Sequence, residues 1–75
     1  MLDKLRKIIC EFVDIEPENI TPETNIRRDL GLNSMELVNL AVEIEEEFDL
    51  EIPDREASNL ETVADAMRVI KEYMD

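Results

Sequence analysis

Apolar residues recur at helical spacing in the first part of the chain and again in its middle. The first stretch predicts a helix that stops near Asp14, before Pro17, with Asp3 as a candidate N-cap. The second predicts a helix from about Ser34 to Asp49. The core stripe expected of the first helix is Leu5, Ile8, Ile9, Phe12 and Val13. The core stripe expected of the second is Leu37, Leu40, Ala41, Ile44 and Phe48.

The last part of the chain predicts two further helical segments. A helix is expected to begin near Thr62, which is a candidate N-cap, and a short turn of helix is expected at 55–59, with Leu60 as its anchor. The inward residues of the last helix are expected to be Val63, Ala64, Met67, Ile70 and either Tyr73 or Met74. Because few segments alternate between apolar and polar residues, the fold class is predicted to be all-α.

Residues 15–33 form a long stretch that predicts no regular element. Loops of this length in compact domains are usually functional or disordered. Spaced apolar residues and the stiffening effect of Pro17 and Pro22 instead favour an ordered loop pinned to the core. The apolar anchors are Ile15, Ile20, Ile26, Leu30 and Leu32.

Length and composition narrow the function classes. With 75 residues the chain is expected to be one domain, 1–75, that is too small for a deeply buried catalytic site. It has no histidine and one cysteine, which excludes histidine-based triads, Cys/His metal clusters and an internal disulfide. Cys10 lies off the first core stripe and is interpreted as a peripheral free cysteine. No segment has the length of a membrane span or the pattern of a signal peptide, so we expect a cytoplasmic protein.

The charge is strongly negative and unevenly distributed. The formal net charge is −12, a sign that disfavours binding to nucleic acid or to anionic membrane surfaces. Residues 29–54 contain nine acidic residues and no basic one. This segment is either a solvated helix face or a docking surface for basic partners.

Ser34 stands at the junction between the long loop and the second helix. Gly31 just before it permits a backbone turn that other residues resist. Serine is a preferred N-cap, so capping alone is one explanation of Ser34. A serine needs a base to act as a nucleophile, and the sequence offers no histidine and no nearby lysine or arginine. If Ser34 takes part in chemistry, a second protein must activate it.

Two sequence blocks resemble the acyl carrier protein family. Residues 29–35, Asp-Leu-Gly-Leu-Asn-Ser-Met, are similar to the family signature Asp-Leu-Gly-x-Asp-Ser-Leu. Residues 45–54, Glu-Glu-Glu-Phe-Asp-Leu-Glu-Ile-Pro-Asp, resemble the acidic helix end and Glu-Ile-Pro segment of the same family. The likeness extends over essentially the whole chain. The family usually has Asp where Asn33 stands, which leaves open which transferase and partner enzymes recognise this chain.

The resemblance implies a four-helix bundle with a short third helix and a long ordered loop between the first two helices. It implies a carrier, not an enzyme, with 4′-phosphopantetheine attached to Ser34 from coenzyme A by a phosphopantetheinyl transferase. The arm would present acyl thioesters to acyl-transfer and chain-elongation enzymes of fatty-acid, lipid or polyketide biosynthesis. We expect these enzymes to have basic docking patches, and the carrier to be monomeric, without membrane insertion and without a specific metal site.

A candidate docking patch follows Ser34 on the second helix. Met35, Val38 and Val42 lie off the core stripe of that helix, so they are expected to form an apolar patch near Ser34. They are otherwise explained as covered by loops or as ordinary exposed apolar residues. The acids expected to surround the patch are Glu36, Glu45 and Glu46, and Asn33 is expected to contact partners as well.

Other function classes also fit parts of the sequence. A D-alanyl or an aminoacyl or peptidyl carrier would share the fold and the serine. An acidic helical interaction module, with Ser34 only a helix cap, belongs to a different class. A calcium sensor is excluded because the sequence lacks the Asp-rich EF-hand loop with its glutamate in the twelfth position.

Overall fold

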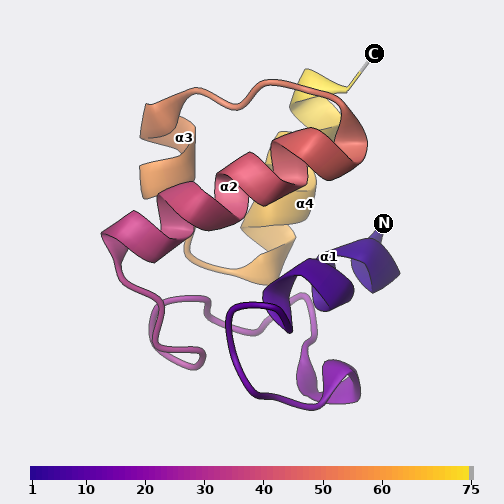
Figure 1. Cartoon of the computed structure of the whole chain (residues 1–75), viewed down its shortest axis with the longest axis vertical. Helices are drawn as coiled ribbons and strands as arrows, with labels where there is room; N and C mark the ends of the chain where they lie inside the picture. The colour runs from indigo at the N-terminus through magenta and orange to yellow at the C-terminus, as the bar shows by residue number, and fades with distance from the viewer. Residues whose placement is uncertain (75) are drawn as a thin grey trace.

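The computed structural model describes residues 1–74 and contains four α-helices within that range (Figure 1). They are α1 (Leu2–Ile9), α2 (Ser34–Phe48), α3 (Asp54–Ser58) and α4 (Val63–Tyr73), with one 3₁₀ turn, η1, at Pro17–Asn19. Figure 1 shows α2 crossing the molecule in front of α4, with α3 beside the first half of α2 and α1 below its second half. The expected helical bundle with a short third helix is confirmed.

The core lies between the helices and is made of aliphatic side chains. Four of the five residues in the predicted stripe of α2 are buried, and Phe48 is half-buried against the same core. The fully buried residues of largest volume come from all parts of the chain: Leu5, Ile9, Ile20, Ile26, Leu37, Leu40, Ile44, Leu60, Val63, Val69 and Ile70. The described helices are too short or too polar to cross a membrane.

The predicted end and cap of α1 are wrong. The helix ends at Ile9, and the chain then tightens into turns in which Glu11 N–H donates to Ile8 O and Phe12 N–H to Ile9 O. The apolar period runs past the helix because these turns keep Phe12 half-buried against the core. Asp3 is not the N-cap: Met1 is, and the Asp3 carboxylate lies 3.6 Å from the Arg6 guanidinium.

The inward face of α4 is rotated from the predicted one. Ala66 and Val69 are buried with Val63 and Ile70, whereas Ala64 is exposed and Met67 is half-buried. Both possible stripes contain Val63 and Ile70, so apolar spacing alone could not separate them. The predicted N-cap Thr62 is confirmed, because its side chain accepts from the Asp65 N–H at 3.1 Å.

The long loop, residues 10–33, is ordered by hydrogen bonds as well as by burial. The Ile26 N–H donates to Glu61 O at 2.7 Å, and the Val63 N–H donates to Thr24 O at 3.0 Å. The loop is thereby attached to the start of α4. Four of the five predicted anchors are buried, and Ile15 is half-buried. Ser34 therefore follows a segment that is fixed to the core.

Candidate functional site

Ser34 is the first residue of α2 and is not its cap. The N-cap is Asn33, whose backbone is extended (φ −88°, ψ 178°). The expectation that Ser34 could be explained as an N-cap is therefore wrong. Asparagine and serine are about equally preferred as caps, and Asn33 holds the position. The Ser34 hydroxyl is therefore not needed to cap the helix.

A capping box surrounds Ser34. The Asn33 Oδ1 accepts from the Glu36 N–H at 2.8 Å, and the Glu36 Oε1 accepts from the Asn33 N–H at 3.0 Å. Two hydrogen bonds thus close the turn that contains Ser34. The chain enters this turn through Gly31, whose φ of +73° is in the left-handed region, and through the buried Leu32.

The Ser34 side chain is exposed and has no hydrogen-bond partner within residues 1–74. The N–H groups of Ser34 and Met35 also lack an acceptor in that range, because the first turn of a helix has none of its own. An uncovered primary hydroxyl beside two unpaired N–H donors suits a covalently attached anionic group. The residues present fit a phosphodiester at this position.

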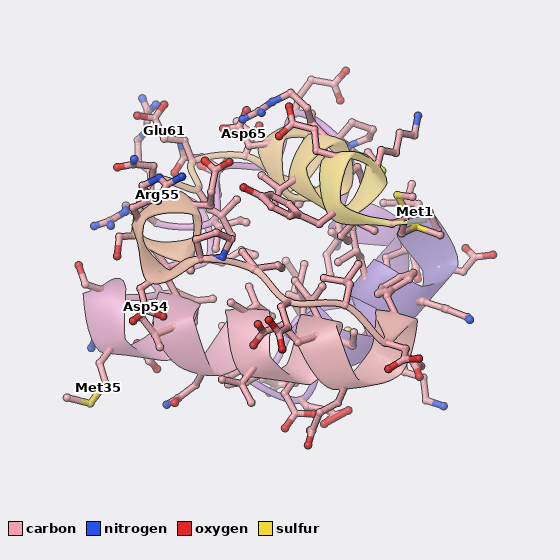
Figure 2. The ribbon with its side chains drawn as sticks, turned by 90° about the horizontal axis from the view of Figure 1, so that it is seen from above. Met1, Met35, Asp54, Arg55, Glu61 and Asp65 are labelled. Atoms are coloured by element: carbon pink, nitrogen blue, oxygen red, sulfur yellow. The ribbon has the colours of Figure 1, made fainter. Side chains whose placement is uncertain are left out.

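The three patch residues differ in exposure. Met35 is 75% exposed and Val42 is 45% exposed, whereas Val38 is half-buried. Figure 2 shows Met35 projecting away from the molecule at the start of α2. The structure thus leaves Met35 and Val42 open to contact and gives Val38 a smaller open surface.

The polar residues predicted to contact partners have different surroundings. Asn33 and Glu36 bind each other in the capping box. The Glu45 Oε2 accepts from the Ile52 N–H at 2.7 Å and so fixes the segment after α2. Glu46 is exposed. Of the predicted acids, Glu46 is the one whose carboxylate has no hydrogen bond among the described residues.

A groove that the sequence did not predict continues this surface toward the end of α2. It lies between α2, the segment 49–53 and Tyr73, and four carboxylates line it without any basic residue. Asp49 starts the segment in a left-handed conformation (φ 54°), which turns the chain back along the helix. The resemblance of residues 51–53 to a family Glu-Ile-Pro segment was the feature of the sequence that could have located this groove. The lining residues are Val42, Glu45, Glu46, Asp49, Leu50, Glu51, Ile52, Pro53 and Tyr73.

Tyr73 contacts α3 from the end of α4. Its hydroxyl donates to the Glu56 Oε2 at 3.3 Å. Partial burial, followed by the nearby Glu56 carboxylate, raises the pKa of Tyr73 above its ordinary value of 10.0.

The other candidate chemical groups lie outside this surface. The Cys10 thiol is half-buried and donates to Ile15 O at 3.4 Å. Within residues 1–74, no group of three or more His, Cys, Asp and Glu residues is arranged to hold a metal ion.

Comparisons with known proteins give consistent findings. A family model described as a phosphopantetheine attachment site matches residues 3–70. The chain is 43% identical to the acyl carrier protein of Phenylobacterium zucineum (strain HLK1) over 74 residues, which cover 99% of this chain and 94% of that one. It is 43% identical to the acyl carrier protein of Caulobacter vibrioides (strain NA1000 / CB15N) over 72 residues, with 96% and 92% covered. A solved structure of the acyl carrier protein from Enterococcus faecalis has a TM-score of 0.80 and 38% identity, with 95% of this chain and 90% of that chain covered.

Proposed function

The chain belongs to the acyl carrier protein family, whose members hold 4′-phosphopantetheine covalently, and from this premise we propose that Ser34 is the residue that carries the arm. The observation that carries the proposal is the position of Ser34. It is exposed at the start of α2, and its neighbour Asn33 does the capping. The alternative function, an acidic interaction module in which Ser34 is only the N-cap, is therefore less well supported.

The chemistry of attachment needs a second protein. The Ser34 oxygen would form a bond to the phosphorus of coenzyme A that carries the pantetheine group. The P–O bond of the diphosphate bridge at that phosphorus would break, and adenosine 3′,5′-bisphosphate would leave. The hydroxyl proton would pass to a base of the phosphopantetheinyl transferase, since the chain has no histidine and Ser34 has no hydrogen-bonded base within residues 1–74. The unpaired N–H groups of Ser34 and Met35 favour the phosphate charge at this helix end.

When bound, the arm supplies a thiol that holds acyl groups as thioesters. We propose that the chain is a cytoplasmic, monomeric carrier and not itself an enzyme. It presents the acyl groups to acyl-transfer and chain-elongation enzymes of fatty-acid or related lipid or polyketide biosynthesis. The acyl carrier relatives favour acyl cargo over D-alanyl, aminoacyl or peptidyl cargo.

The proposed docking surface combines the apolar patch with the acidic groove. Met35 and Val42 provide exposed apolar contact, with Val38 half-buried between them on α2. The carboxylates of Glu45 and Glu46 line the groove next to Val42. An apolar centre with acidic neighbours fits an enzyme patch that has an apolar contact and basic residues around it.

The attachment site is tested by intact mass spectrometry. Incubation of the parent chain with coenzyme A and a broad-specificity phosphopantetheinyl transferase is expected to add about 340 Da, the mass of the arm. Ser34→Ala is expected to gain nothing. Ser58→Ala is the matched control, because Ser58 is the other serine of the sequence and is also exposed. An unmodified parent, or a modified Ser34→Ala variant, contradicts the proposal.

A further inference from the structure

We propose that Glu36 is a positioning residue for the modification of Ser34, and that its carboxylate acts inside the chain and not on a partner. This inference rests on the proposed function of Ser34. The sequence placed Glu36 among the acids of the docking patch. The structure instead turns its carboxylate back toward the residue that precedes the serine.

Two hydrogen bonds join Glu36 to Asn33, the residue that precedes Ser34. Its Oε1 accepts from the Asn33 N–H at 3.0 Å, while its own N–H donates to the Asn33 Oδ1 at 2.8 Å. Ser34 lies between the two residues that make these bonds. Because both bonds close the same turn, they fix the backbone from which the Ser34 hydroxyl projects.

The loss of these bonds has a defined consequence for modification. Without the Glu36 carboxylate the first turn of α2 frays more often, because one of its two closing bonds is gone. A transferase must find the serine on an ordered helix start, so it would react with a smaller share of the molecules. The loss therefore appears in kcat/KM, although Glu36 need not contact coenzyme A or the transferase.

Substitution of Glu36 by glutamine distinguishes a docking charge from a positioning role. A glutamine at this position of a capping box keeps the hydrogen bond and removes the charge. Glu36→Gln therefore preserves a positioning role and abolishes a docking charge. Glu36→Ala abolishes both. Salt separates the two roles as well, because it screens an exposed charge contact far more than an internal hydrogen bond.

The chain contains its own control for general destabilisation. A second capping box starts α4, where the Asp65 Oδ2 accepts from the Thr62 N–H at 3.1 Å and the Thr62 Oγ1 accepts from the Asp65 N–H at 3.1 Å. Asp65→Ala breaks this box and leaves the Ser34 turn intact. It reproduces the loss of a capping carboxylate at another helix.

The experiment measures kcat/KM of the transferase with coenzyme A for the parent, Glu36→Gln, Glu36→Ala and Asp65→Ala. We expect a loss of roughly three- to tenfold for Glu36→Ala, and values within about twofold of the parent for Glu36→Gln and Asp65→Ala. The deficit of Glu36→Ala is expected to persist in about 0.5 M salt. Amide hydrogen exchange at Asn33 is expected to accelerate in Glu36→Ala and not in Glu36→Gln.

Three results overturn the inference. A loss in Glu36→Gln as large as in Glu36→Ala shows a docking charge. An equal loss in Asp65→Ala shows that general destabilisation is responsible. Unchanged kcat/KM in Glu36→Ala shows that the box does not matter for modification. A parent that is not modified at all is recognised separately, because it also overturns the proposed function itself.

Discussion

At the scale of single residues, the position of the N-cap determines whether Ser34 is needed to start α2. The sequence indicated that a helix starts at Ser34, and the structure confirms that start. The sequence could not show whether Asn33 or Ser34 caps the helix, because both residue types are preferred N-caps and the two residues are adjacent. The partner at the third helical position resolves the question: the Glu36 N–H bonds to Asn33. The serine is thereby left without a capping role.

Asn33 offers a test of how a transferase reads this turn. Aspartate is as good an N-cap as asparagine, so Asn33→Asp is expected to leave α2 intact while adding a charge beside Ser34. A charge-assisted contact is about twice as strong as a neutral one. We expect kcat/KM of an acyl-carrier-type transferase to rise roughly tenfold or more, and that of a broad-specificity transferase to change much less.

Asn19→Asp is the control for this substitution. Asn19 is exposed in η1, so the variant adds the same charge away from the start of α2. Equal acceleration in both variants would attribute the effect to net charge. Equal rates for the parent and Asn33→Asp with both transferases would show that neither enzyme uses the contact.

At the scale of elements, the sequence predicted best where one apolar stripe was clearly the longest. The stripe of α2 has five residues, more than the second apolar set on that helix, and both the bounds of α2 and its buried face were predicted to within one residue. The α4 segment has apolar residues on two overlapping faces, and the hydrogen bonds between the loop and its first turn select one of them. The same long-range hydrogen bonds order the loop. The local sequence pattern therefore predicted which apolar residues anchor the loop, but not the course of its backbone.

The short helix α3 depends on polar contacts at both of its neighbours. Ala57 is its buried residue. The Arg27 Nη2 donates to Ser58 O at 2.8 Å, and Tyr73 reaches Glu56 from α4. No local sequence pattern predicts these pairs, because their members are far apart in the chain. They connect α3 to the long loop and to α4.

Tyr73 reports on the contact between α3 and α4. It is the single tyrosine of a chain without tryptophan, so its ionisation can be followed by ultraviolet absorbance. The midpoint is expected above pH 10.0 in the folded chain and near it in denaturant. Glu56→Gln is expected to lower the folded midpoint, because the carboxylate that disfavours tyrosinate is removed. Glu11→Gln, an exposed change in another segment, is expected to leave it in place.

The raised pKa of Tyr73 also predicts how the free energy of unfolding changes with pH. The fold favours protonated Tyr73, so this contribution is fully present below about pH 10 and is lost as the pH rises through the folded pKa. Tyr73→Phe is expected to remove that part of the pH dependence in denaturant titrations. A folded midpoint at or below 10.0 would contradict the contact.

At the scale of the whole molecule, segregation of charge indicates how partners approach. The net charge is −12, and two acids of α2, Glu45 and Glu46, share one groove with exposed Val42 and with Asp49 and Glu51 of the segment after the helix. Like-charge neighbours one turn apart on a helix repel, so this arrangement does not favour stability. In the proposed function it steers basic enzymes, whose association is expected to weaken as salt screens the charges.

Val42 tests the docking surface directly. Val42→Asp is expected to retain the helicity seen by circular dichroism, because Val42 is already 45% exposed. It is expected to lower kcat/KM of an acyl-carrier-type transferase by roughly tenfold, because a charge enters an apolar contact. Ala64→Asp adds the same charge at an exposed apolar residue of α4 and is expected to have little effect. Equal effects of the two variants would contradict the proposed surface.

Mass spectrometry of the chain purified from its native host tests the central claim most directly. Trypsin cuts after Arg28 and Arg55, and in the resulting peptide, 29–55, Ser34 is the only residue with a side-chain hydroxyl or thiol. The account predicts that this peptide carries about 340 Da, plus the mass of any acyl group, and that the other peptides are unmodified. The arm on another peptide, or an unmodified peptide 29–55 throughout the population, would contradict it.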